Sequence, residues 1–282
     1  MPELTNMSYI RALCEKHGFA LSKGFGQNFI VNPSVCPRMI AASGIDKSYG
    51  VLEIGPGIGV LTKEAAKAAA KVVSVEVDTR LPALLEESLA EVDNVKIVLG
   101  DVLKTDLAEL IREEFAGLKV AVVANLPYYI TSPILMKLLE ERLPIESITV
   151  MVQKEAADRI AAAPGSRESG AISLAVRYFA EPETLFTVSP GSFTPPPKVT
   201  SAVIKLVPHT VPPVRPANEK RMFAIIKAAF SQRRKTAVNG ISAGLSLPKV
   251  TVAEAVESLG RGAMVRPENM LLEDFAKLSA LL

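Results

Sequence analysis

The sequence predicts an α/β fold: a parallel sheet covered by helices on both faces, followed by a small all-helical C-terminal domain. Three observations support this prediction. Strand-like and helix-like segments alternate regularly from residue 51 to residue 163. The strand-like segments are nearly continuous apolar runs, as expected for strands buried on both faces. Four prolines then fall within nine residues, at positions 208, 212, 213 and 216, and only helical patterns follow them.

The individual elements follow in a regular order. An arm or short helix is expected within residues 1–23, then a loop at 25–32 and a helix from Pro33 to about Gly44. Strands are expected at 51–54, 72–77, 95–99, 120–124 and 147–152, and helices at 61–70, 81–90, 107–115, 133–143 and 155–163. A helix near 172–178, a strand pair at 184–188 and 202–207, and about four helices in 218–282 complete the chain. The prolines predict a boundary between residues 1–208, which begin with an arm of about 30 residues, and a helical domain, 209–282.

The composition is that of a globular protein. The chain has 282 residues, of which 49% are hydrophobic and 22% charged, and its mean hydropathy is +0.26. Disordered and collagen-like classes are excluded. No apolar run approaches the roughly 18–20 residues of a membrane span, and the first residues do not resemble a signal peptide. Two cysteines and two histidines predict neither a disulfide framework nor a zinc site. We expect a soluble, cytoplasmic, metal-free protein.

The charge is distributed unevenly along the chain. The net charge is only +2, but residues 190–250 hold ten basic residues and one acidic residue, Glu219, so this stretch carries +9. The asymmetry favours a polyanionic partner for the C-terminal third. Arg233, Arg234 and Lys235 form the densest basic run, for which phosphate contact and an ordinary solvated helix end are the two interpretations.

A glycine-rich turn directly follows the first predicted buried strand, in the segment Glu53-Ile-Gly-Pro-Gly-Ile-Gly59. Glycines allow a tight turn and a close approach of a ligand to the backbone. The dinucleotide fingerprint requires a glycine five residues after Gly55, where this chain has Val60. This departure disfavours a nicotinamide dehydrogenase. A plain tight turn with no ligand is the other interpretation.

Carboxylates stand at the ends of the next two predicted strands. Glu76 lies 21 residues after Gly55, where a carboxylate can accept hydrogen bonds from both hydroxyls of a ribose. Asp101 follows the third strand and can accept from the exocyclic amine of an adenine. Each has a simpler interpretation, a solvated acid for Glu76 and a helix N-cap for Asp101. Together with the glycine turn, they lie at the sheet edge where ligands bind in open α/β folds.

The fourth strand ends in the most specific motif of the chain, Asn125-Leu126-Pro127-Tyr128. The exocyclic amine of adenine is a poor nucleophile because its lone pair is delocalised into the ring. Two acceptors that hold its hydrogens, the Asn125 side-chain oxygen and the Leu126 carbonyl, would draw the nitrogen towards tetrahedral geometry. Pro127 would stiffen the turn, and Tyr128 would stack on the base. An ordinary Asn-x-Pro turn with a packing aromatic is the alternative.

With these motifs the chain resembles the ribosomal RNA adenine dimethyltransferase family, and within it the bacterial small-subunit (16S) branch linked to kasugamycin sensitivity. The matching stretches occur in family order and cover nearly the whole chain: residues 25–30, 53–57, 75–78, 100–101, 125–128, 153–155, 192–199 and 230–236. The resemblance implies a Rossmann-like S-adenosylmethionine-dependent methyltransferase sheet in residues 1–208 and an rRNA-binding helical domain in residues 209–282.

The resemblance also implies roles for individual residues. The positions matching Asn28 and Ile30 contact S-adenosylmethionine from the N-terminal loop, and those matching Gly55 and Gly57 pack under it. The family often has Leu at the position of Ile30. Three further positions bind the ribose, the adenine and the region near the sulfonium: Glu76, Asp101 and Asn125. Phe193, in the Phe-Thr-Pro-Pro-Pro segment, is expected to cover the second face of a flipped adenine, with a place in the core as the alternative.

We therefore expect N6,N6-dimethylation of two adjacent adenosines in a loop near the 3′ end of small-subunit rRNA, within the immature small subunit, by a monomer. The product of the donor is S-adenosylhomocysteine. A large-subunit methylase of the macrolide-resistance type shares these motifs, although the segment Phe-Ser-Gln-Arg-Arg-Lys-Thr favours the small-subunit branch. Three further functions stay open: a DNA adenine methyltransferase, a ribosome-assembly checkpoint factor with secondary catalysis and, remotely, a nicotinamide oxidoreductase.

Overall fold

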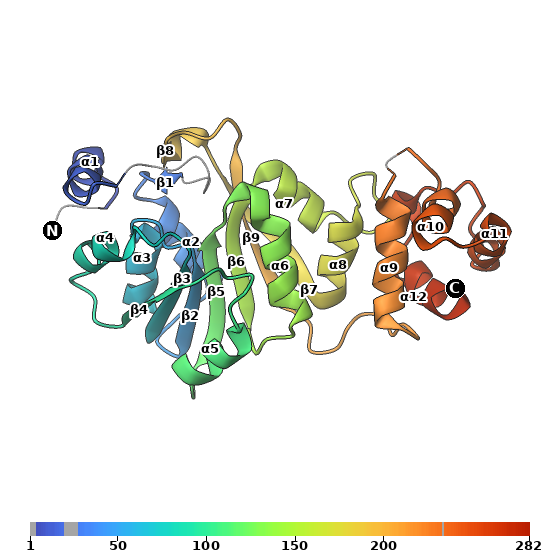
Figure 1. The fold of residues 1–282 in the computed structure, drawn as a ribbon, viewed down its shortest axis with the longest axis horizontal. Coiled ribbons are helices and arrows are strands. Elements are labelled where there is room, and N and C mark those ends of the chain that lie inside the picture. Colours follow the sequence, from blue (N-terminus) through green and yellow to red (C-terminus); the bar gives the residue numbers. More distant parts are fainter. Residues whose placement is uncertain (1–3, 20–27, 233) are drawn as a thin grey trace. The chain divides into compact units, whose positions relative to one another are not determined.

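The computed structural model describes residues 4–19, 28–232 and 234–282 (Figure 1). The chain forms two compact units. The first consists of Met1–Ala157 and Glu183–Pro208, and the second of Asp158–Pro182 and His209–Leu282. The border at Pro208 coincides with the proline-rich stretch. Among the described residues, no helix has the length and apolar character that crossing a membrane requires.

A seven-stranded sheet forms the centre of the first unit, in the order β4-β3-β2-β5-β6-β9-β7 (Figure 1). The strands are β2 (Tyr49–Ile54), β3 (Lys71–Glu76), β4 (Val95–Leu99), β5 (Lys119–Asn125), β6 (Ser147–Gln153), β7 (Ala180–Val188) and β9 (Ser201–Pro208). The neighbours from β4 to β6 are parallel, and β9 runs antiparallel to β6. The predicted parallel sheet and the additional strand pair are confirmed.

The order of the strands determines where a ligand can bind. From β2 the chain passes outward to β3 and β4, and it then returns to β5 on the other side of β2. The connections therefore diverge between β2 and β5. In open α/β sheets, ligands bind at such a switch point, beyond the carboxyl ends of the strands.

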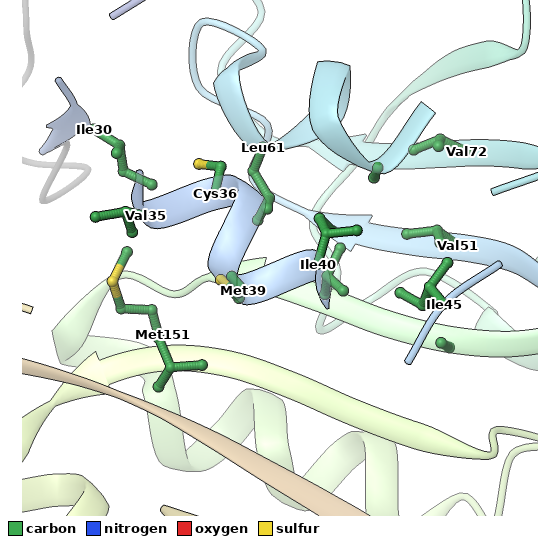
Figure 2. Packing of buried hydrophobic residues seen from close by; sticks show 14 of the residues in the cluster. Ile30, Val35, Cys36, Met39, Ile40, Ile45, Val51, Leu61, Val72 and Met151 are labelled. Atoms are coloured by element: carbon green, nitrogen blue, oxygen red, sulfur yellow. The ribbon is translucent and has the colours of Figure 1, made fainter. Parts of the chain in front are cut away.

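Helices α2 (Val35–Ser43) and α3 (Val60–Ala68) pack on one face of this sheet. Figure 2 shows their contact, in which Cys36 and Met39 of α2 lie near Leu61 of α3, with Met151 of β6 among the surrounding strand residues. Helix α2 ends as expected at Gly44, whose φ of 77° is the left-handed conformation that glycine adopts readily. The other helices of the alternating region are α4 (Pro82–Ser88), α5 (Leu107–Glu114), α6 (Thr131–Glu140) and α7 (Lys154–Ala161).

Helix α1 (Met7–Lys16) is the short N-terminal helix that the sequence predicts. The Asn6 side chain caps its first turn by accepting hydrogen bonds from the backbone N–H groups of Ser8 and Tyr9. At its other end, Lys16 and His17 both contact the Glu87 carboxylate of α4, each at 2.8 Å. These contacts attach α1 to α4, and both helices lie on the side of the sheet where β4 is the edge strand (Figure 1).

A two-stranded antiparallel sheet was not foreseen from the sequence. Strand β1 (Phe29–Ile30) pairs with β8 (Phe193–Thr194), with Ile30 opposite Phe193. Strands of two residues show no periodicity, so their pattern could not reveal them. The pairing joins the N-terminal loop to the proline-rich segment.

The second unit is helical, with α8 (Ala171–Phe179), α9 (Glu219–Phe230), α10 (Ala237–Leu245), α11 (Lys249–Ser258) and α12 (Leu272–Leu281). Helices α9 and α10 pack so closely that a Cβ on Gly240 would lie only 2.7 Å from the Ala229 carbonyl oxygen. The sequence places residues 158–182 in the N-terminal domain, whereas their contacts group them with the helical unit. The physical reason is α8, whose Tyr178 hydroxyl donates to Glu219 at 2.7 Å while Phe179 stacks on Phe223.

Candidate active site

One open cavity of about 850 Å³ lies at the carboxyl ends of β2, β3, β4 and β5. The lining side chains come from the segments that follow these four strands, from the N-terminal loop and from α6. They are Asn28, Phe29, Ile54, Gly55, Gly57, Val75, Glu76, Val77, Gly100, Asp101, Val102, Asn125, Leu126, Pro127, Tyr128, Tyr129, Ile130 and Ile134.

The glycine turn leaves backbone open to this cavity. Gly55, Gly57 and Gly59 have φ values of 71°, 58° and 90°, a conformation that side chains with a Cβ rarely adopt. A Cβ on Gly55 would meet no atom within 4 Å, so the space beside this residue is open. The turn therefore leaves room for a ligand to approach the backbone at Gly55.

Beneath the turn lies a carboxyl group that the sequence did not single out as functional. Glu53 is 1% exposed and accepts a hydrogen bond of 2.5 Å from the Ser74 hydroxyl. Burial raises the pKa of Glu53 to about 7, despite the opposing effect of the Ser74 hydrogen bond.

Glu76 is buried at the end of β3, with 5% of its surface exposed. One carboxylate oxygen accepts the Asp78 N–H at 2.7 Å, which fixes the side chain against the cavity wall. Burial raises the pKa of Glu76, and backbone N–H groups, that of Asp78 first, oppose this shift. The interpretation of Glu76 as a solvated strand-end acid is wrong, because a buried carboxylate faces the cavity.

Asp101 lines the cavity after β4, with 36% of its side chain exposed. Its Oδ1 accepts the Leu103 N–H at 3.0 Å, and its Oδ2 lies 3.6 Å from the Lys104 ammonium. The next helix, α5, is capped by Asp106. The alternative of Asp101 as a helix N-cap is therefore wrong, since its side chain shapes the turn at the cavity instead.

The Asn125 amide is oriented by the N-terminal loop. Its Nδ2 atom donates to the Asn28 carbonyl at 3.3 Å, which leaves Oδ1 as the acceptor on the other side of the amide. The Leu126 side chain is buried, and the Leu126 N–H donates to the Met151 carbonyl at 3.1 Å. The Pro127 carbonyl accepts from the Ile130 N–H at 3.2 Å, so the turn after Asn125 is held by backbone bonds.

Two neighbouring tyrosines follow this turn on the short 3-10 helix η2 (Tyr128–Ile130). Tyr128 is half-buried, and its hydroxyl shares a hydrogen bond of 2.7 Å with the Ser201 hydroxyl. Burial raises the pKa of Tyr128, and the Ser201 hydrogen bond opposes this shift. Tyr129 also lines the cavity but is 60% exposed.

Two of the residues expected to contact the donor or the target base do not line this cavity. Ile30 and Phe193 are 4% and 3% exposed and belong to the core cluster around α2 and α3. The burial of Phe193 in this cluster favours a place in the core, and its expected contact with a flipped adenine stays a prediction. The core alternative is the one the structure supports. The neighbours Asn28 and Phe29 line the cavity in place of Ile30.

Comparison with known proteins identifies the family. A model of the ribosomal RNA adenine dimethylase family matches residues 18–271. The chain belongs to this family. Among its relatives, ribosomal RNA small subunit methyltransferase A of Lachnoclostridium phytofermentans is 47% identical over 95% of this chain and 93% of that protein. The protein of the same name from Lysinibacillus sphaericus is 44% identical over 95% of this chain and 92% of its own length.

Two solved structures are similar to this adenine dimethylase over most of their length. A dimethyladenosine transferase from Plasmodium falciparum has a TM-score of 0.72 and 27% identity, covering 89% of this chain and 95% of its own. The 23S rRNA methyltransferase ErmE has a TM-score of 0.67 and 26% identity, and the match covers 90% of this chain and 99% of that protein. The predicted methyltransferase fold is thus confirmed, and the chain is an rRNA methyltransferase rather than a nicotinamide oxidoreductase.

Eight apolar or aromatic cavity residues of this adenine dimethylase were not predicted as site residues from the sequence: Phe29, Ile54, Val75, Val77, Val102, Tyr129, Ile130 and Ile134. Phe29 stacks on Phe19 at 6.1 Å, and a Cβ on Gly57 would lie 3.5 Å from its ring. Phe29, Val77, Val102 and Tyr129 immediately follow residues that were identified, so the position next to an identified residue was the available signal. The others resemble ordinary core residues.

The basic residues of the family segment lie in the second unit. Arg234 and Lys235 are exposed after α9, and Arg233 lies outside the described residues. In the part of the chain that the structure describes, no group of three or more His, Cys, Asp or Glu side chains could hold a metal ion.

Proposed function

We propose that this protein transfers methyl groups from S-adenosylmethionine to N6 of two adjacent adenosines near the 3′ end of small-subunit rRNA, forming N6,N6-dimethyladenosine. One observation carries the proposal: a glycine turn, two carboxylates and the Asn125–Tyr128 motif line a single cavity at the switch point of the sheet. The relatives named small subunit methyltransferase A support the choice of substrate.

The chemistry of the residues that line the cavity fits the donor. The open backbone at Gly55 suits close approach of the amino-acid portion, and Glu76 would accept hydrogen bonds from the ribose hydroxyls. Asp101 would accept from the adenine amine between the apolar side chains of Val77 and Val102. Asn28 would close this part of the cavity from the N-terminal loop. When bound, S-adenosylmethionine supplies a methyl group that its sulfonium already activates, and S-adenosylhomocysteine remains.

The protein's own contribution is to position and desolvate the adenine N6. The Asn125 side-chain oxygen and the Leu126 carbonyl would accept the two N6 hydrogens and favour a tetrahedral nitrogen. The Asn28 carbonyl supports this role, because it binds the Asn125 NH₂ group and so directs the oxygen away from itself. N6 releases a proton after it has gained the methyl group, so a strong base is not required.

The target base must leave its stack to reach the cavity. Tyr128 would stack on it, a contact worth about 1–3 kcal/mol per base. The ring of Phe193 has no part in this proposal because it is in the core. Residues 1–208 would thus hold the donor and the base.

The helical domain, residues 209–282, would bind rRNA. The basic residues Arg233, Arg234 and Lys235 would contact phosphates, as is typical of a basic cluster facing a polyanion. The expected context is the immature small ribosomal subunit in the cytoplasm, with the enzyme acting as a monomer.

The proposal is tested by transfer of a tritiated methyl group to purified small subunits that lack the modification. We expect incorporation of label into small-subunit RNA and a loss of at least a hundredfold with Asn125→Ala, whose cofactor affinity is measured separately. Absence of label, with the cofactor bound, would contradict the substrate. Absence of cofactor binding would contradict the assignment of the cavity.

The large-subunit function has one observation in its favour, the fold similarity to ErmE over 90% of this chain. The same assay with large subunits separates the two functions. Label in large-subunit RNA only would favour this second function over the first.

A further inference from the structure

The hydroxyl of Tyr128 is held by a side chain that neither the motif nor the cavity includes. Ser201 lies 73 residues further along the chain, and its Oγ is 2.7 Å from the Tyr128 hydroxyl oxygen. Ser201 is 0% exposed. A buried hydroxyl requires a hydrogen-bond partner, so the two groups constrain each other.

The sheet topology explains why Ser201 is so near the site. Strand β9 begins at Ser201 and runs antiparallel to β6, with Ser201 opposite Gln153, the last residue of β6. The start of β9 is therefore at the same sheet edge as the carboxyl ends of β2 to β6. The Thr200 carbonyl also accepts the Lys154 N–H at 2.9 Å, which fixes the backbone before the strand.

This hydrogen bond limits what Tyr128 can do. Its hydroxyl is engaged with Ser201, and burial raises its pKa, so the phenol stays neutral and is not suited to accept a proton from N6. What the residue can offer to a ligand in the cavity is therefore its aromatic ring. Tyr128 belongs to η2, a turn of three residues. The hydrogen bond between its hydroxyl and the buried Ser201 hydroxyl restricts the rotation of the ring.

We propose that Ser201 is a positioning residue that fixes the Tyr128 ring as the stacking surface for the target adenine. The inference rests on the proposed methyl transfer to adenosine. Ser201 touches neither the donor nor the base, and it acts only through the Tyr128 hydroxyl. The proline-rich segment before β9 thereby contributes to the base pocket through Ser201 rather than through Phe193.

The test is a double-mutant cycle with Ser201→Ala, Tyr128→Phe and the combination, assayed on small subunits. Each single variant is expected to lower kcat about tenfold, equivalent to about 1.4 kcal/mol, with KM for the subunit unchanged. The double variant is expected to lose no more than either single one. Ser201→Thr, which keeps the hydroxyl, should retain most activity. Ser147→Ala is the matched control, because Ser147 is also buried but begins β6 at the opposite sheet edge.

Cofactor affinity and binding stoichiometry, measured by calorimetry, separate positioning from misfolding. They should stay within about twofold of the wild type in all variants, a difference well below 1.4 kcal/mol. If the losses in kcat of the two single variants added up in the double variant, the role of Ser201 would be overturned. The same holds if Ser201→Ala lowered the melting temperature but left kcat unchanged, and in both cases the proposed function would stay intact. A wild-type enzyme that transfers no methyl group to small subunits would overturn both.

Discussion

Replacing Glu53 with glutamine should change how the stability of the first unit depends on pH. Glu53 is 1% exposed, and burial raises the pKa of its carboxyl from an ordinary 4.5 to about 7. The folded protein therefore binds the proton more tightly than the unfolded chain. The stabilising effect of the protonated acid is fully present below pH 4.5 and is lost as the pH rises through 7.

The magnitude follows from the two pKa values. They differ by about 2.5, which corresponds to a loss of about 3 kcal/mol in the free energy of unfolding between about pH 4.5 and pH 7.5. Because the Glu53 side chain is almost completely buried, solvent screening reduces this free-energy change only slightly. Ser74 can donate its hydrogen bond equally well to the carbonyl oxygen of a glutamine.

The assay is urea unfolding of the wild type and Glu53→Gln at several values between pH 4.5 and pH 8, followed by circular dichroism. Other titrating groups cancel in the difference between the two proteins. We expect the stability of the variant relative to the wild type to rise by about 3 kcal/mol over this interval and to stay level above it. A difference that is independent of pH would refute the claim that the Glu53 carboxyl is buried and ionises within the folded protein.

Three further predictions concern cofactor binding and packing. Glu76→Gln should weaken S-adenosylmethionine binding about 10- to 100-fold, because hydrogen bonds to charged groups contribute about 1.5–3 kcal/mol, and an unchanged Kd by calorimetry would contradict its role. Phe193→Ala should destabilise the protein by about 3–5 kcal/mol in urea unfolding, whereas Phe193→Leu should keep most transferase activity. An inactive but stable Phe193→Leu variant would restore the stacking role. Gly240→Ala should destabilise the helical unit by about 1–3 kcal/mol, since its Cβ would lie 2.7 Å from a backbone oxygen. Gly262→Ala, where a Cβ meets no atom within 4 Å, is its control in thermal unfolding.

The central sheet could be predicted because its signals are local. The runs that form β2, β3 and β5 are largely apolar and buried, and β3 and β5 end in a polar residue at the ligand edge, whereas β2 is followed by a glycine there. Parallel strands bring such positions together, so Gly55, Glu76 and Asn125 could be placed in one site from the sequence alone.

Other features depend on contacts distant in sequence. The proline run after Phe193 suggests a rigid support for an aromatic ring, but only the pairing of Phe193 with Ile30 directs that ring into the core. Likewise, the Asn125 orientation depends on a carbonyl 97 residues away and Tyr128 on a hydroxyl 73 residues away. The grouping of 158–182 with the helical unit depends on the packing of α8 against α9. No local pattern encodes these contacts.

The most direct measurement is the mass spectrometric identification of the nucleosides formed in small-subunit RNA. Unmodified small subunits are incubated with S-adenosylmethionine and either the wild-type protein or Asn125→Ala, and the RNA is digested to nucleosides. We expect N6,N6-dimethyladenosine with the wild type and a loss of at least a hundredfold with the variant, while both bind the cofactor. A methylated nucleoside other than an N6-methylated adenosine, or full activity of Asn125→Ala, would contradict this expectation.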